Sequence, residues 1–124
     1  LNEKYLEVLI NAHEFFLSIN IGDNFIGFIK GRADYRDEGG IWIMSMFISS
    51  PYQSNGLGTR ALNLFINDIY ERLGIRKFYA CIVSDNIRGR FFWENNGFKE
   101  YRMTKDYFTL DNKNYDLIIL RKII

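Results

Sequence analysis

The spacing of apolar residues in the first third of the chain predicts a helix followed by a hairpin. Apolar residues recur at helical intervals through residues 1–12, with charged residues between them. Two stretches rich in β-branched and aromatic residues follow, 14–21 and 25–31, and the residues between them, Gly22-Asp23-Asn24, are typical of a tight turn. The polar segment 32–40 ends in two glycines, which indicates an exposed loop.

The middle of the chain predicts a buried strand that leads into a long helix. Residues 41–48 are apolar at almost every position, so we expect a strand covered on both faces, and Pro51 marks its end. From Leu57 to Leu73 apolar residues recur at helical spacing, and Gly74 is a typical helix stop.

A second pair of elements follows, again a strand and then a helix. Residues 76–84 have the composition of another buried strand. Asp85 or Asn86 is suited to cap a helix that ends at Asn96-Gly97.

Two final strands, 99–110 and 115–123, are joined by the turn residues 111–114. The order of elements is therefore helix, two strands, a third strand, helix, strand, helix and two strands. This order predicts an α/β fold of the α+β kind, in which helices pack on a mixed sheet.

Composition and charge narrow the class of protein. The 124 residues, 48% of them hydrophobic, suffice for one domain spanning residues 1–124. Sixteen basic and fifteen acidic residues give a net charge of +1, which argues against a nucleic-acid partner. A single cysteine suits a reducing compartment, and no apolar stretch reaches the ~20 residues of a membrane span, so we expect a cytoplasmic protein. The chain begins at Leu1 and not at Met, which leaves open that an N-terminal strand or helix is missing from it.

The segment Gln53–Thr59 has the chemistry of an anion-binding loop. It follows the apolar strand and begins the predicted helix, so backbone N–H groups without intrahelical partners gather there, at the positive end of the helix dipole. Gly56 and Gly58 allow phosphate oxygens to approach the backbone. The segment lacks the Gly-Lys-Ser/Thr ending of a nucleotide-triphosphate loop and the third glycine of the dinucleotide fingerprint. We therefore predict a loop that holds a pyrophosphate through backbone amides alone.

Two motifs together resemble the GCN5-related N-acetyltransferase (GNAT) family. The first, Gln53-x-x-Gly56-x-Gly58, lies between a predicted strand and a predicted helix. The second is Asn86-x-x-Gly89-x-x-Phe92-Trp93-Glu94-x-x-Gly97-Phe98. The match covers about residues 41–98, and the hairpin before it and the two strands after it also fit the family's order of elements.

The resemblance implies a fold with an acetyl-coenzyme A site. The sheet would be mixed, mostly antiparallel and flanked by helices, and two parallel strands, 41–48 and 76–84, would splay apart to form the acyl-CoA cleft. The loop would hold the pyrophosphate and Asn86 the pantetheine arm. The implied cofactor-binding residues are Phe47, Ile48, Gln53, Ser54, Asn55, Gly56, Leu57, Gly58, Thr59, Arg60, Asn86, Arg88, Arg90 and Trp93. No metal is expected.

The activity that the resemblance implies is N-acetyl transfer. An acetyl group would move directly from acetyl-coenzyme A to a primary amine of a small-molecule or peptide acceptor. A polyamine, an amino sugar, an amino acid and a protein N-terminus all stay open as acceptors. The resemblance implies no nucleic-acid or membrane partner, and leaves open whether the protein is a monomer or a homodimer.

Two positions depart from the family pattern. Trp93 stands where many members carry a Tyr that protonates the leaving thiolate; an indole N–H is a donor but not a usable acid. We interpret Trp93 as a residue that lines the channel beside the sulfur. Met44 stands where a general-base Glu often lies, which leaves Glu38 in the preceding loop as the base candidate, along with Asp34 and Asp37. The alternative function is a non-catalytic acyl-CoA-binding regulatory domain that kept the loop and lost the acid and base.

The remaining reactive side chains give little indication of a catalytic or metal site. Cys81 lies in an apolar strand, where an inert thiol is favoured over a nucleophile. One histidine, His13, and one cysteine make a zinc site or a Ser-His-Asp triad unconvincing. Tyr101 is expected to be a sheet residue, with replacement of the missing acid as its alternative role.

Overall fold

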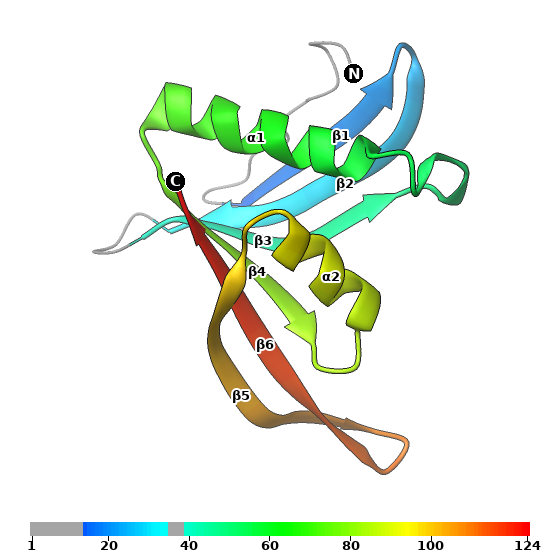
Figure 1. The fold of residues 1–124 in the computed structure, drawn as a ribbon, viewed down its shortest axis with the longest axis vertical. Helices are drawn as coiled ribbons and strands as arrows, with labels where there is room; N and C mark the ends of the chain where they lie inside the picture. Colours follow the sequence, from blue (N-terminus) through cyan, green and yellow to red (C-terminus); the bar gives the residue numbers. More distant parts are fainter. Residues whose placement is uncertain (1–13, 35–38) are drawn as a thin grey trace.

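The computed structural model describes residues 14–34 and 39–124, and in these ranges one mixed sheet carries two α-helices (Figure 1). The sheet has six strands in the order β1-β2-β3-β4-β6-β5. Only β3 and β4 pair in parallel; the other neighbouring strands are antiparallel. The elements are β1 Glu14–Ile21, β2 Asn24–Ala33, β3 Ile41–Ile48, the short 3₁₀ helix η2 Ser50–Tyr52, α1 Leu57–Leu73, β4 Lys77–Val83, α2 Ile87–Asn95, β5 Lys99–Leu110 and β6 Lys113–Ile123. This arrangement confirms the predicted mixed, mostly antiparallel sheet.

Both helices cover the same face of the sheet. In Figure 1, α1 lies across β1 to β3, and α2 lies in front of β3 and β4. Helix α1 buries the stripe Ala61, Leu62, Phe65 and Ile66, while α2 buries a single residue, Trp93. These side chains join one hydrophobic core with apolar residues of β1, β2, β3, β4 and β6. The core therefore holds α1 through a broad apolar face and α2 through a narrow one.

Local sequence signals fix the ends of both helices. Gly74 adopts a left-handed conformation (φ 70°) and its N–H donates to the Tyr70 carbonyl, so α1 ends where the glycine predicts. The Asn86 side chain accepts a hydrogen bond from the Gly89 N–H and caps α2. At the other end of α2, Gly97 is left-handed (φ 88°), as expected for the end of a helix. The predicted helix over residues 1–12 lies outside the described residues.

Strand β3 is covered less than its sequence predicts. Its first half is buried, but the Met44 and Phe47 side chains are 53% and 46% exposed. The expectation of a strand covered on both faces was therefore wrong for its second half. The reason is that α1 and α2 both pack on one face. On the opposite face Phe47 stacks against Phe28, which stacks against Phe16, so among the described residues aromatic neighbours in the sheet contact Phe47.

Two boundaries also differ from the sequence-based expectation. Strand β2 continues to Ala33, because its ladder with β3 extends to the pair Ala33 and Ile41. Strand β6 starts at Lys113, because only Asp111 and Asn112 form the turn. Both turn residues have positive φ angles (51° and 63°), which Asn and Asp tolerate better than most residues.

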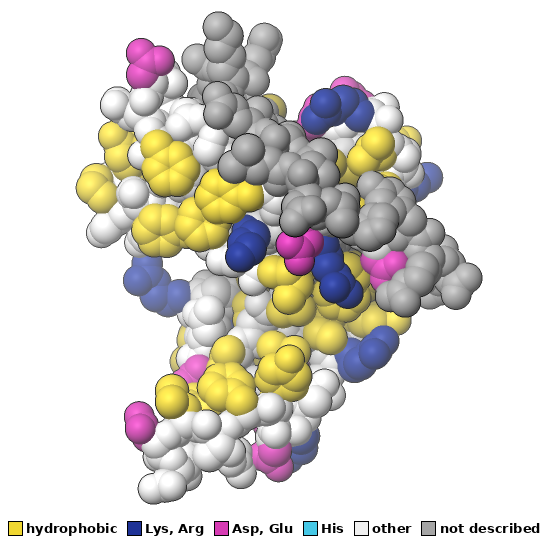
Figure 2. All heavy atoms as spheres, turned by 180° about the vertical axis from the view of Figure 1, so that it is seen from behind, with side chains coloured by type: hydrophobic (Ala, Val, Ile, Leu, Met, Phe, Trp, Pro, Cys, Tyr) yellow, Lys and Arg dark blue, Asp and Glu magenta, His cyan; other side chains and the backbone are white. Residues whose placement is uncertain are grey.

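The β5–β6 hairpin extends beyond the rest of the sheet (Figure 1). The ladder between β4 and β6 ends at Val83 and Leu117, while β5 and β6 stay paired as far as Leu110 and Lys113. Every residue of β5 is exposed. Figure 2 shows the face of the molecule away from α1 and α2, and on this face the β5–β6 hairpin carries one of the visible groups of hydrophobic side chains.

Candidate functional site: a cleft between two parallel strands

The parallel strands β3 and β4 touch along only part of their length. Their ladder consists of three pairs, Ile41 with Phe78, Trp42 with Tyr79 and Ile43 with Ala80. From Met44 to Ile48 no described residue pairs with β3 on its β4 side. The predicted splay is therefore present.

A bulge at Met44 gives the splay a local cause. In the ladder with β2, Ile43 lies opposite Gly31 and Ser45 lies opposite Lys30, so Met44 is an extra residue in β3. A β-bulge bends its strand and increases the local twist. This bulge follows directly after the last parallel pair, so β3 stays with β2 and turns away from β4.

A groove of about 580 Å³ lies at the open end of these strands. Residues of β3, of the loop before α1, of α1 and of α2 line it: Met46, Ile48, Gln53, Ser54, Gly56, Gly58, Thr59, Asn86, Arg88, Gly89, Phe92 and Trp93. Both sequence motifs thus contribute to one surface, although about thirty residues separate them in the chain.

The loop Gln53–Thr59 presents uncommitted backbone donors to this groove. The first N–H of α1 with an intrahelical partner is that of Arg60, which donates to the Gly56 carbonyl. No described residue accepts from the N–H groups of Leu57, Gly58 and Thr59; no side chain caps the helix, and no acidic residue lies in its first turn. An anion is the natural partner for such a helix end.

Loop geometry explains the spacing of the first motif. The Gln53 side chain donates to the Ile48 carbonyl (2.7 Å) and so ties the loop to the end of β3. Ser54 (φ 66°) and Gly56 (φ 74°) are both left-handed, which turns the chain into the helix within a few residues. At Gly58 a Cβ atom would lie 3.2 Å from the Phe92 ring, so this glycine lets α1 and α2 approach closely.

The start of α2 forms the other side of the groove. The Asn86 Oδ1 atom accepts from the Gly89 N–H (2.9 Å), and this cap favours glycine at position 89, since a Cβ there would lie 2.5 Å from the Asn86 Nδ2 atom. Asn86 is therefore a helix cap, one of the two roles that its sequence allows. Within the described residues its Nδ2 atom has no acceptor, so it remains available to a ligand in the groove.

The structure places most, but not all, of the predicted cofactor-binding residues at the groove. Those that line it are Ile48, Gln53, Ser54, Gly56, Gly58, Thr59, Asn86, Arg88 and Trp93. Those that do not are Phe47, Asn55, Leu57, Arg60 and Arg90. The Phe47 side chain stacks on Phe28 across the opposite face of the sheet, so only its backbone can take part.

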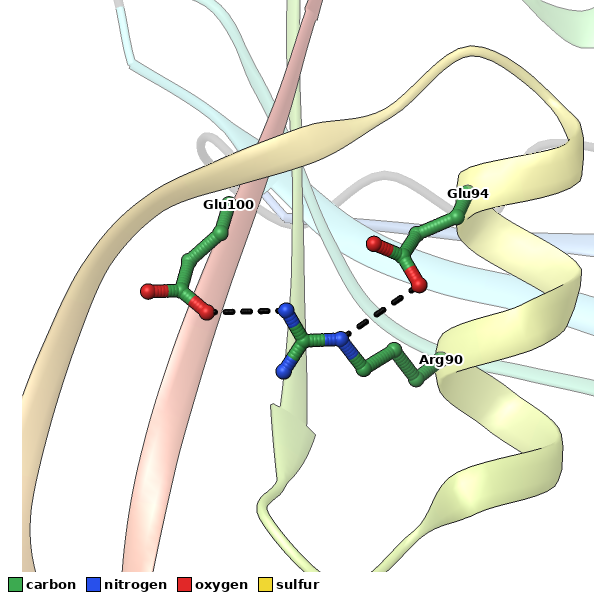
Figure 3. Close-up of polar contacts among 3 residues, drawn as sticks. All are labelled: Arg90, Glu94 and Glu100. Carbon is green, nitrogen blue, oxygen red and sulfur yellow. Dashed lines mark hydrogen bonds and ion pairs between the residues drawn. The ribbon is translucent and has the colours of Figure 1, made fainter.

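Arg90, one of the predicted cofactor-binding residues, pairs with acidic side chains that do not line the groove. Its guanidinium pairs with Glu100 of β5 (2.9 Å) and with Glu94 one helical turn away (3.4 Å), as Figure 3 shows. One position on a helix turns a side chain by about 100°, so Arg88 and Arg90 project in nearly opposite directions. Arg88 is exposed at the groove, whereas Arg90 joins α2 to β5 and does not line the groove.

The groove is poor in acid–base groups. Arg88 is the one charged side chain among its described lining residues, and Trp93, only 7% exposed, contributes an indole wedged between the rings of Phe92 and Phe98. The base candidates Glu38 and Asp37 lie outside the described residues. Burial raises the pKa of the Cys81 thiol, so less of it is thiolate at neutral pH, as expected for an inert side chain.

Three lining residues were missed by the sequence analysis: Met46, Gly89 and Phe92. Alternation along β3 puts Met46 on the same face as Ile48, so the strand pattern contained that signal. The role of Phe92 depends on its contact with Gly58, which the sequence pattern does not reveal.

No described helix is long and apolar enough to cross a membrane. Within residues 14–34 and 39–124, no three His, Cys, Asp or Glu side chains gather in a way that could hold a metal ion.

Comparison with known proteins gives a consistent family assignment. The family model described as "Acetyltransferase (GNAT) domain" matches residues 1–119. No curated protein matches the chain. Among solved structures, the ribosomal-protein-S18-alanine N-acetyltransferase from Escherichia coli aligns with a TM-score of 0.78 at 17% identity, over 93% of this chain and 72% of that one.

Two further solved structures have the same fold. An acetyltransferase from Salmonella typhimurium that modifies the N-terminal serine of ribosomal protein L7/L12 aligns with a TM-score of 0.80 at 17% identity, over 91% of this chain and 65% of that one. Arabidopsis thaliana NAA60, in complex with a bisubstrate analogue, aligns with a TM-score of 0.74 at 13% identity, over 92% and 77%. At these identities the likeness concerns the fold.

Proposed function

Since the chain belongs to the GNAT acetyltransferase family, we propose that it transfers an acetyl group from acetyl-coenzyme A to a primary amine. The observation that carries this proposal is the separation of β3 from β4 directly beside an uncapped helix end. A long cofactor with an anionic end needs both an unpaired strand edge and an anion-binding site, and the groove offers the two side by side.

The chain's own residues suggest how acetyl-coenzyme A would be held. The pyrophosphate would accept hydrogen bonds from the backbone N–H groups at the start of α1, with the Arg88 guanidinium near its charge. The pantetheine arm would lie along the open edge of β3, where Asn86 Nδ2 is an available donor. Trp93 would lie beside the thioester and exclude water from it.

The transfer itself forms a C–N bond and breaks a C–S bond. The deprotonated amine attacks the thioester carbonyl, the coenzyme A thiolate leaves, and the proton lost by the amine restores the thiol. Backbone N–H groups at the open edge of β3 are the candidate donors for the oxyanion. The described lining of the groove has no acid or base, so positioning of the two reactants would supply much of the acceleration, and water or the base candidate Glu38 would accept the proton of the amine.

The acceptor would be a small-molecule or peptide amine. Of the proteins compared above, one is a ribosomal-protein-S18-alanine N-acetyltransferase and another modifies the N-terminal serine of ribosomal protein L7/L12, which motivates testing a peptide N-terminus first. A polyamine, an amino acid and an amino sugar complete the panel.

Release of free thiol from acetyl-coenzyme A, measured over this amine panel, tests the proposal. We expect thiol release that depends on one class of amine. The same assay with Gly58→Asp is the control for the site, because it adds a negative charge to the turn that is proposed to bind the phosphate. Hydrolysis without any dependence on an amine would contradict acetyl transfer.

A second candidate function is a regulatory domain that binds acyl-coenzyme A without transferring the acyl group. The absence of a described acid or base in the groove favours it. Calorimetric binding of coenzyme A with no turnover on any amine would select this alternative, and turnover on any amine of the panel would exclude it.

A further inference from the structure

Asn96 occupies an unusual position in the described part of the chain. It is the one polar side chain that is buried there, with 8% of its surface exposed. Burial of an amide is costly unless its groups are hydrogen-bonded, so its contacts indicate what it does.

The hydrogen bonds of Asn96 join three elements. Its Nδ2 atom donates to the Phe92 carbonyl of α2 (2.8 Å) and to the Thr59 Oγ1 atom of α1 (3.3 Å). Its backbone carbonyl accepts from the Lys122 ammonium of β6 (2.8 Å). One residue just after α2 therefore ties this helix to the first turn of α1 and to the sheet.

Two of these partners, Thr59 and Phe92, line the groove from opposite sides. The first turn of α1 that carries Thr59 also carries the uncommitted N–H groups, and the Phe92 ring lies against Gly58 in the same turn. The hydrogen bonds from Asn96 to Thr59 and Phe92, here called the Asn96 bridge, thus connect the α1 side of the groove to its α2 side.

Besides the Asn96 bridge, the contact of the Phe92 ring with Gly58 is what holds α2 beside α1 in the described residues. Helix α2 buries one apolar side chain, Trp93, and its ion pair through Arg90 connects to β5 on the other side. From these contacts we propose that Asn96 is a positioning residue for coenzyme A: it sets the spacing between the phosphate-binding turn of α1 and the α2 side of the groove. This inference rests on the proposed function, because it concerns the same cofactor site.

The test compares Asn96→Leu with the unchanged protein by calorimetric titration with coenzyme A, alongside thermal unfolding. Leucine has the same number and branching of side-chain heavy atoms as asparagine and donates no hydrogen bond. We expect the Kd for coenzyme A to rise about tenfold, in the range of a lost buried hydrogen bond. In turnover with acetyl-coenzyme A, KM should rise while kcat changes little, since Asn96 does not touch the reacting atoms.

Ile19→Ala is the matched control for stability alone. Ile19 is buried in β1 and does not line the groove, so its truncation should lower Tm and leave the Kd unchanged. An Asn96→Leu variant that likewise loses Tm but keeps its Kd would overturn the inference and assign Asn96 a purely structural role.

Thr59→Val provides a second variant if Asn96→Leu does not fold, and it completes a double-mutant cycle if it does. It removes the hydroxyl at the α1 end of the bridge and keeps the bond from Asn96 to Phe92. Because Thr59 itself lines the groove, the cycle decides: a smaller effect of Thr59→Val on the Kd when Asn96→Leu is already present supports the bridge. Full additivity of the two changes, or an unchanged Kd in Thr59→Val alone, would contradict it.

The outcomes separate this inference from the proposed function. If the unchanged protein does not bind coenzyme A, the proposed function fails and takes the inference with it. If the unchanged protein binds and the Asn96→Leu and Thr59→Val variants bind equally well, only the inference fails.

Discussion

At the scale of single residues, Asn86 combines two roles that can be separated by substitution. Its Oδ1 atom caps α2, and its Nδ2 atom, which has no acceptor among the described residues, is available to a ligand in the groove that Asn86 lines. Asn86→Ala removes both, so we expect a loss of about 1 kcal/mol in the free energy of unfolding together with weaker coenzyme A binding.

Asn86→Asp isolates the second role. An aspartate keeps the capping oxygen, and its charge favours a helix N-terminus, so Tm should be maintained. The variant loses the Nδ2 donor, so the Kd for coenzyme A should still rise. Thermal unfolding and calorimetry on the two variants check this pair, and unchanged affinity in both would leave Asn86 as a cap only.

Gly58→Asp should change stability and binding in opposite directions. A carboxylate in the first turn of α1 interacts favourably with the helix dipole, so the protein should stay folded, apart from the adjustment that Phe92 must make. The same carboxylate repels phosphate, so coenzyme A binding should be lost. Asn67→Asp, which adds the same charge to the exposed middle of α1, is the control and should bind normally. If Gly58→Asp keeps its affinity for coenzyme A, the phosphate does not bind at this turn.

At the scale of elements, the two arginines of α2 give a contrast that the sequence alone does not offer. Arg88 lines the groove, so Arg88→Gln should weaken coenzyme A binding and make it less sensitive to salt. Arg90→Gln should leave binding unchanged and cost less than about 1 kcal/mol of stability, because its ion pairs are partly exposed. Titrations with coenzyme A at low and high salt distinguish the two variants. If both weaken binding equally, Arg90 also contributes to coenzyme A binding.

Trp93 connects the groove to the core of the domain. Trp93→Phe should fold and keep most activity, whereas Trp93→Ala should lose about 3–5 kcal/mol of stability, since the ring packs between Phe92 and Phe98. The pH–rate profiles of the unchanged protein and of Trp93→Phe should have the same shape, because Trp93 donates no proton to the leaving thiolate. Loss of turnover in a well-folded Trp93→Phe variant would show that the indole N–H itself takes part.

The sequence predicted those features that depend on residues close together in the chain. The left-handed residue that ends α1 and the side chain that caps α2 are set by neighbouring residues, and so Gly74 and Asn86 were placed correctly. Features that depend on how one strand is aligned with its neighbour could not be predicted from the sequence in this way. The splay came from a family resemblance, while its cause, the bulge at Met44, appears only when β3 is aligned with β2. The direction of the Arg90 side chain likewise depends on where Glu100 lies in β5.

At the scale of the whole molecule, the two helices share one face and the sheet opens at its centre (Figure 1). The groove is therefore framed by α1, which follows β3, and by the start of α2, which follows β4, so that changes in either helix alter it. Asn96, which joins α1, α2 and β6, is the residue where these elements meet.

The unpaired stretch of β3 has a consequence for hydrogen–deuterium exchange. Amides of residues 44–48 that face β4 have no described acceptor, so they should exchange rapidly, while residues 41–43 remain protected by their ladder. A pantetheine arm bonded along this edge would act as a temporary strand and slow the exchange of 44–48. Slowing confined to 53–59 would mean that the arm does not use the edge. Because the ligand completes the sheet only in the folded state, resistance to proteolysis should rise with the concentration of coenzyme A.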